Sequence, residues 1–191
     1  MNVIAFNGSP RKGGNTEILL NYVLNELKNE GIETELIQIG GKPIHGCTAC
    51  HTCFQNKNRR CVIENDMIND CIAKIADADG ILLGSPVYFA DITPEMKAFL
   101  DRVGFVSVAN NDLYKRKVGA AVIAVRRGGA MHAFDSINHF FLHRQMIVPG
   151  SCYWNMGIGQ EKGDVEKDEE GIRTMKILGQ NMAWLLKKLG N

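Results

Sequence analysis

Short apolar runs alternate with amphipathic segments along most of this chain. Apolar runs at residues 3–6, 80–85 and 118–125 predict buried strands; the partly alternating segment 33–39 and the short run 147–149 bring the number to five. Apolar residues spaced at three and four positions predict helices at about 16–28, 67–75, 93–103, 130–146 and 168–189. Pro149 places the last strand at an edge of the sheet, where a missing N–H donor does no harm.

This alternation predicts an α/β fold with a parallel sheet between two helical layers. For five strands we expect the order 2-1-3-4-5, which is the flavodoxin-like, three-layer α/β/α topology. The chain shows no internal repeat and no low-complexity linker, so residues 1–191 are expected to form a single domain. Residues 44–64 lack periodicity and contain four cysteines, so we expect a loop that carries a cysteine motif.

The first predicted strand leads directly into the polar, glycine-rich loop of residues 7–16. A helix follows, and the free amides and dipole of a helix N-terminus bind anions. Ser9, Asn15 and Thr16 add neutral hydrogen-bonding groups, Arg11 adds charge, and Gly14 lets the backbone come close. The loop matches neither the GxxxxGK(S/T) nor the GxGxxG motif, which leaves a terminal phosphomonoester such as that of FMN, or an ordinary strand-to-helix turn.

Composition and charge exclude several other classes of protein. The 191 residues are 45% hydrophobic and 23% charged, as in a soluble globular protein, and the net charge is +1. Such a balance favours neither nucleic acid nor an anionic membrane surface as a partner. No secretion signal and no apolar run of about 20 residues is visible, so we expect a cytoplasmic protein.

The four cysteines of segment 44–64 have the spacing of a metal or cluster site. Cys47, Cys50 and Cys53 follow a C-x2-C-x2-C pattern, and Cys61 comes after seven further residues. Thiolates at steps of three can converge on one [4Fe–4S] cluster, which is our first interpretation. Zinc more often uses two separated C-x2-C pairs, and free or redox-active thiols are the third possibility. Cys71 lies on the apolar face of a predicted helix and is expected in the core.

Three motifs resemble the NAD(P)H-dependent FMN reductase branch of flavodoxin-like proteins: FNGSPRKGGNT, GSPVYFADITPEMKAFLDR, and the Arg-Arg-Gly-Gly turn after a buried strand. The cysteine motif narrows the resemblance to the iron–sulfur flavoproteins, in which it holds a [4Fe–4S] cluster. The resemblance implies that Ser9, Arg11, Asn15 and Thr16 bind the FMN phosphate, that Pro86, Val87, Tyr88, Phe89 and Asp91 surround the isoalloxazine ring, and that Arg126, Arg127, Gly128 and Gly129 lie near its pyrimidine end. It also implies a homo-oligomer, either a dimer or a tetramer.

Together these features predict an FMN-dependent oxidoreductase. We expect a protein that couples FMN to a [4Fe–4S] cluster and passes electrons to or from a ferredoxin-like carrier. One alternative is a NAD(P)H-dependent FMN or quinone reductase without a cluster, and another is a non-enzymatic redox sensor. No acid–base dyad is required, because the flavin carries the chemistry.

Overall fold

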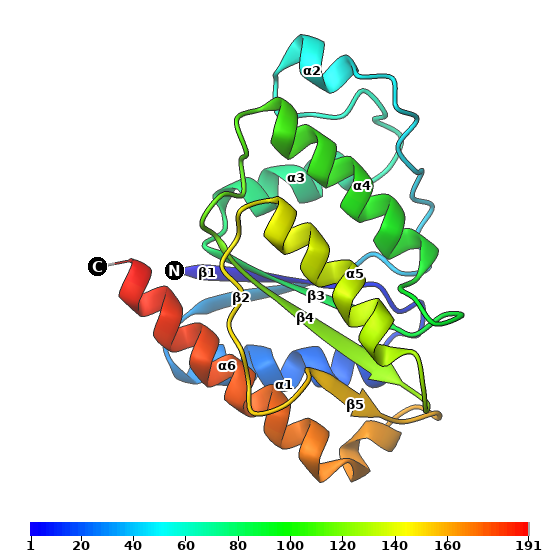
Figure 1. Ribbon diagram of the computed structural model, residues 1–191, viewed down its shortest axis with the longest axis vertical. Helices are drawn as coiled ribbons and strands as arrows, with labels where there is room; N and C mark the ends of the chain where they lie inside the picture. The colour runs from blue at the N-terminus through cyan, green and yellow to red at the C-terminus, as the bar shows by residue number, and fades with distance from the viewer. Residues whose placement is uncertain (191) are drawn as a thin grey trace.

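The computed structural model describes residues 1–190 and shows a five-stranded sheet between two layers of helices (Figure 1). Its strands are β1 (Asn2–Asn7), β2 (Glu33–Gln38), β3 (Gly80–Pro86), β4 (Val118–Val125) and β5 (Met156–Ile158). They are parallel and lie in the order β2-β1-β3-β4-β5, so the predicted topology is confirmed. All strand carboxyl ends therefore meet at one edge of the sheet.

Two helices cover one face of the sheet and three cover the other. On the first face lie α1 (Asn15–Asn29) and α6 (Glu169–Leu189); on the second lie α3 (Ile68–Asp77), α4 (Pro94–Ala109) and α5 (Ala130–His143). Successive residues of β1 alternate between the two cores, as the pleat requires. Within residues 1–190 no helix is both long and apolar enough to cross a bilayer; α6, with 21 residues, is too polar.

The start of α4 is tied to the loop after β1. Thr93 caps the helix by accepting from the N–H of Met96 at 3.3 Å, and Pro94 occupies the first helical position, as its sequence predicts. The Thr93 hydroxyl also donates to the carbonyl of Gly8 at 2.9 Å. One capping residue therefore fixes the position of α4 relative to the glycine-rich loop.

The edge strand is not the one that the sequence predicts. Residues 147–149 make a single bridge, between Ile147 and Val118, and the chain then leaves the sheet. Pro149 has no N–H to continue the ladder, and the edge position beside β4 is filled by β5 instead. The region between the expected strand 147–149 and the expected helix 168–189 thus contains β5 and the 3-10 helix η1 (Asp164–Lys167).

The cysteine segment also contains structure that its lack of periodicity did not predict. A short helix, α2 (Thr52–Asn56), lies on the far side of α4 from the sheet (Figure 1). Its flanking residues His51 and Lys57 both adopt left-handed backbone conformations, which isolate this single turn from the chain on either side. The helix carries Cys53 and follows Cys50 closely.

Candidate functional site

A cavity of about 210 Å3 opens at the carboxyl edge of the sheet, where β1, β3, β4 and β5 end. Nine residues predicted for the FMN site line it: Ser9, Arg11, Gly14, Asn15, Thr16, Pro86, Val87, Tyr88 and Arg126. Ala124, Gly159, Gln160 and Lys162 complete the lining. Residues from four separate segments of the chain are therefore brought to one place, as expected for a parallel sheet.

The polar end of this cavity has the features of an anion site. Gly14 is the N-cap of α1 and provides no side-chain cap for the first helical amides. Thr16, in the first turn, is 1% exposed, and its Oγ1 has no hydrogen-bond partner within the described residues 1–190. A buried hydroxyl is rarely left unpaired, so this orphan at a helix N-terminus fits a phosphate oxygen.

Asn15 lines the cavity, and its side chain also holds a neighbouring segment in place. Its side chain donates to the carbonyl of Glu161 at 2.9 Å and accepts from the N–H of Gly163 at 2.9 Å. Both of its polar ends therefore hold the segment after β5 against the start of α1. Arg11 reaches the same segment by donating from Nη1 to the carbonyl of Gln160 at 3.3 Å.

This arrangement brings in a cation that the sequence analysis missed. Lys162 lines the cavity, and its ammonium group donates to the carbonyl of Lys12 at 3.3 Å. The sequence did contain a signal for Lys162, but the last strand was predicted at residues 147–149, so the segment after residue 158 was not considered. Had the last strand been placed at residues 156–158, the strand-end rule would have selected the segment that begins at Gly159.

The apolar end is formed by the segment after β3. Tyr88 and Asp91 exchange two backbone hydrogen bonds of 2.8 and 3.0 Å, which close a tight turn. Phe89 and Ala90 at its tip have φ values of 45° and 68°, as a two-residue hairpin of this kind requires. Phe89 is fully exposed and Asp91 faces His132, with 3.4 Å between Oδ2 and Nε2. These two predicted ring contacts therefore lie outside the cavity lining.

Of the four residues predicted near the pyrimidine end, Arg126 lines the cavity and Arg127 and Gly128 are exposed beyond it. Gly129 has a structural role. It is the N-cap of α5 with φ 87°, and a Cβ at this position would lie 2.9 Å from the Cα of Ala90. A glycine here lets α5 begin directly beneath the turn that follows β3.

The four cysteines of segment 44–64 lie around a second, much smaller cavity of about 20 Å3. Cys47, Cys50, Cys53 and Cys61 all line it, together with residues of α4. Their thiols are free. Hydrogen bonds from the hydroxyl and N–H of Thr52 lower the pKa of Cys50, whereas burial raises the pKa of Cys53. The four cysteines of the motif therefore lie around one cavity in the folded protein.

The donor set consists of four cysteine thiols, which are the ligands that an iron–sulfur cluster takes. Across residues 1–190, no three His, Cys, Asp or Glu side chains converge closely enough to hold one metal ion. An iron–sulfur cubane takes four thiolates at separate corners, and the four thiols here surround a cavity of only about 20 Å3, so they must move apart to hold one. Cys71 lies apart in the core, as predicted, and burial raises its pKa to about 12.

Comparison with known proteins gives the same picture. Residues 1–161 match the family model of NADPH-dependent FMN reductase. An iron–sulfur flavoprotein of Methanocaldococcus jannaschii is 37% identical over 98% of both chains. Among solved structures, RosB with a bound 8-demethyl-8-formylriboflavin-5'-phosphate intermediate has a TM-score of 0.73 at 17% identity, covering 100% of this chain and 80% of that one. A flavodoxin from the domain Archaea has a TM-score of 0.64 at 18% identity, covering 98% and 99%.

Fold and cavity are those of a flavin-dependent oxidoreductase built on the flavodoxin-like topology. The chain belongs to the NADPH-dependent FMN reductase family and, within it, to the iron–sulfur flavoproteins.

Proposed function

We propose that this protein binds FMN in the cavity at the strand ends and a [4Fe–4S] cluster on the four cysteines, and that it exchanges electrons with a ferredoxin-like carrier. The observation that carries the proposal is the gathering of Cys47, Cys50, Cys53 and Cys61 around one cavity in a flavin-dependent oxidoreductase. The name of the Methanocaldococcus jannaschii relative, iron–sulfur flavoprotein, supports it.

The FMN phosphate would lie at the N-terminus of α1. There Thr16 offers its unpaired hydroxyl, Gly14 leaves the helix amides free, and Lys162 supplies a positive charge. Ser9 stiffens the loop, because its Oγ accepts from the N–H of Arg11 at 3.3 Å. These groups bind the anion largely through fixed donors, so little reorganisation is needed when it enters.

The isoalloxazine ring would lie against Pro86, Val87 and Tyr88, with the guanidinium of Arg126 nearby. A positive charge there stabilises the anionic reduced ring and so favours reduction. When bound, FMN accepts electrons in pairs and releases them singly, which suits a protein that also holds a one-electron centre. The protein's own contribution is to orient the ring and set its charge environment.

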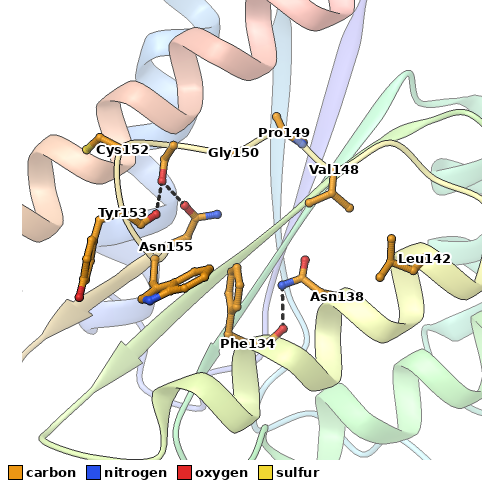
Figure 2. Close-up of a pocket in the computed structure, with 11 residues that line it drawn as sticks. Phe134, Asn138, Leu142, Val148, Pro149, Gly150, Cys152, Tyr153 and Asn155 are labelled. Atoms are coloured by element: carbon orange, nitrogen blue, oxygen red, sulfur yellow. Dashed lines mark hydrogen bonds between the residues drawn. The ribbon is translucent and has the colours of Figure 1, made fainter.

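A second copy of the chain would complete this site. The cavity of about 210 Å3 is smaller than the roughly 300–1,000 Å3 of typical ligand pockets, and Tyr88 and Phe89 beside it are exposed. Met131 and Leu142 of α5 and the nearby Tyr153 and Trp154 are exposed as well. Figure 2 shows Phe134 and Leu142 of α5 facing Val148 across an apolar hollow of about 500 Å3. We therefore propose a homodimer or homotetramer, which light scattering after size-exclusion chromatography would test.

The electron carrier would dock beside the cysteine cavity. Lys57 and Arg59 are exposed on the segment between Cys53 and Cys61. Both have left-handed backbone conformations, with φ of 47° and 60°, and Asn110 fixes the position of Arg59 by accepting from its N–H at 3.0 Å. A fixed basic rim beside a redox centre complements an acidic surface such as that of a ferredoxin-like protein.

The deciding measurement is iron and acid-labile sulfide per FMN in protein purified without oxygen. The proposal predicts about four of each per flavin, bound through four thiolates. Cys50→Ala should then lose cluster absorbance and retain FMN, while Cys152→Ala, which alters an exposed thiol outside the cavity lining, should retain both. FMN without iron in the wild-type protein would refute the cluster and favour an NAD(P)H-dependent reductase. Absence of turnover together with reversible thiol oxidation would favour a redox sensor.

A further inference from the structure

Arg102, in the second half of α4, has the largest side chain that the fold buries completely. Its Nη2 donates to the carbonyl of Ile63 at 2.8 Å, and its Nη1 donates to the carbonyl of His45 at 3.2 Å. Nη1 also pairs with the buried carboxylate of Asp66. His45 precedes the first cysteine of the motif and Ile63 follows the last, so one guanidinium holds both ends of the cysteine segment.

Asp66 strengthens the same connection from the other side. Its Oδ2 accepts from the N–H of His45 at 3.2 Å, and its Oδ1 accepts from the N–H of Ile68, the first residue of α3, at 3.1 Å. Burial opposes the charged carboxylate, but the hydrogen bonds from Arg102, His45 and Ile68 outweigh it and keep the pKa of Asp66 below its ordinary value. The pair is therefore charged at neutral pH, and it connects α3, α4 and the cysteine segment.

Of the two residues of this pair, the arginine lies at the cysteine cavity. Arg102 lines the cavity that the four cysteines share, and Asp66 does not. The Nε of Arg102 is buried and finds no hydrogen-bond partner in the part of the chain that the structure describes. Because an arginine side chain does not lose its proton in proteins, this N–H is a permanent donor without an acceptor. A sulfur atom held in the cavity would be such an acceptor.

Stability alone does not account for the pair. A buried ion pair is often no more stabilising than apolar residues of the same volume, because removing two charges from water is costly. The same network does, however, order a segment that is otherwise weakly structured. Between residues 44 and 64 the only regular element described is the five-residue helix α2, and that helix contains no buried residue.

We propose that Arg102 positions the cysteine segment for cluster binding and donates its Nε–H to a sulfur atom of the bound cluster. The inference rests on the proposed function, since it requires that Cys47, Cys50, Cys53 and Cys61 hold a cluster. Charge and hydrogen bonds to sulfur both set the reduction potential of such a centre. Because Asp66 balances the charge of Arg102, the Nε–H bond to sulfur is the contribution that stabilises the reduced cluster and makes reduction easier.

Two variants test the inference in the full-length, FMN-loaded protein. Arg102→Lys keeps the charge and loses the planar fork that reaches several acceptors at once. The double variant Arg102→Met, Asp66→Asn removes both charges, so no lone carboxylate is left buried. Arg144→Lys is the matched control, because Arg144 is also buried and pairs with Asp112 at 2.8 Å. The readouts are iron and sulfide per FMN, the cluster reduction potential, and amide hydrogen exchange of residues 45–63 in cluster-free protein.

We expect both Arg102 variants to retain FMN and to bind at least threefold less iron than wild type and Arg144→Lys. Residues 45–63 should exchange faster in both, and any cluster in the double variant should have a more negative potential. Unchanged iron content and potential, or a parallel loss of FMN and iron, would overturn the inference. If wild type itself binds no iron, the proposed cluster fails, the Nε–H bond to its sulfur fails with it, and only the positioning of residues 45–63 is left to test. Amide exchange then decides alone: faster exchange supports the positioning role, and unchanged exchange refutes it.

Discussion

Asn69 of α3 holds Cys61 through both backbone groups of that cysteine. Its Oδ1 accepts from the N–H of Cys61 at 2.8 Å, and its Nδ2 donates to the Cys61 carbonyl at 3.0 Å. Asn69 is 4% exposed, so these bonds are shielded from water. Asn69→Ala should leave the two backbone groups poorly paired and lower the free energy of unfolding by about 1–3 kcal/mol.

The same variant should bind less iron while its FMN content stays unchanged, because Asn69 does not line the flavin cavity. Urea denaturation and metal analysis would measure the two effects. Asn181→Ala is a suitable control, since Asn181 donates to the carbonyl of Gly150 at 2.8 Å on an exposed surface. Wild-type iron content in Asn69→Ala would show that the position of Cys61 does not depend on this side chain.

Thr16→Val tests the phosphate end of the flavin cavity. The variant keeps the shape of the side chain and removes a hydroxyl that has no partner within the described residues. FMN-free protein should therefore keep its stability, whereas the Kd for FMN should rise about tenfold, equivalent to ~1.4 kcal/mol. Thr34→Val is the control, because Thr34 Oγ1 on β2 is also buried and unpaired in residues 1–190 but lies outside the cavity. Equal fluorescence titrations for the two variants would contradict the assignment.

Lys162→Met tests the cation that follows β5. Removing a charge-assisted hydrogen bond of about 1.5–3 kcal/mol should weaken FMN binding by roughly tenfold or more. Riboflavin, which lacks the phosphate, should bind the variant and the wild type equally. Lys167→Met removes an exposed lysine that pairs with Asp164 at 3.0 Å outside the cavity lining, and it should change neither affinity. A similar loss of affinity for riboflavin would show that Lys162 acts on the ring or on folding.

The thiol of Cys50 should react at lower pH than an ordinary cysteine in cluster-free protein. Hydrogen bonds from Thr52 lower its pKa below 9.0, so its thiolate persists as the pH falls through values at which an unshifted thiol is protonated. Iodoacetamide labelling followed by mass spectrometry should show an alkylation profile displaced to lower pH, and Thr52→Val should move it back up. Cys71, with a pKa of about 12, should remain unlabelled in the native protein. Identical profiles for wild type and Thr52→Val would contradict the cause assigned here.

Most of the fold could be predicted because its signals are local. The uncharged run of β4 and the Thr93-Pro94 start of α4 depend on neighbouring residues alone, and the structure contains both as expected. The position of the edge strand was predicted wrongly because a strand of three residues has only a weak sequence pattern. The segment Ile147-Val148-Pro149 has two β-branched apolar residues and therefore looks more like a strand than the Met-Gly-Ile of β5. However, Pro149 has no N–H with which to continue the ladder, and β5 pairs with β4 instead.

The sequence by itself determined the first four strands, the glycine-rich loop at a helix N-terminus and the spacing of the four cysteines, since each is specified by residues close together in the chain. Only the tertiary structure decided which side chains serve these sites. Lys162 bonds to Lys12 across 150 positions, and Arg102 reaches His45 across 57. Buried donors and charges must find acceptors wherever the packed layers place them, and no local pattern records that pairing.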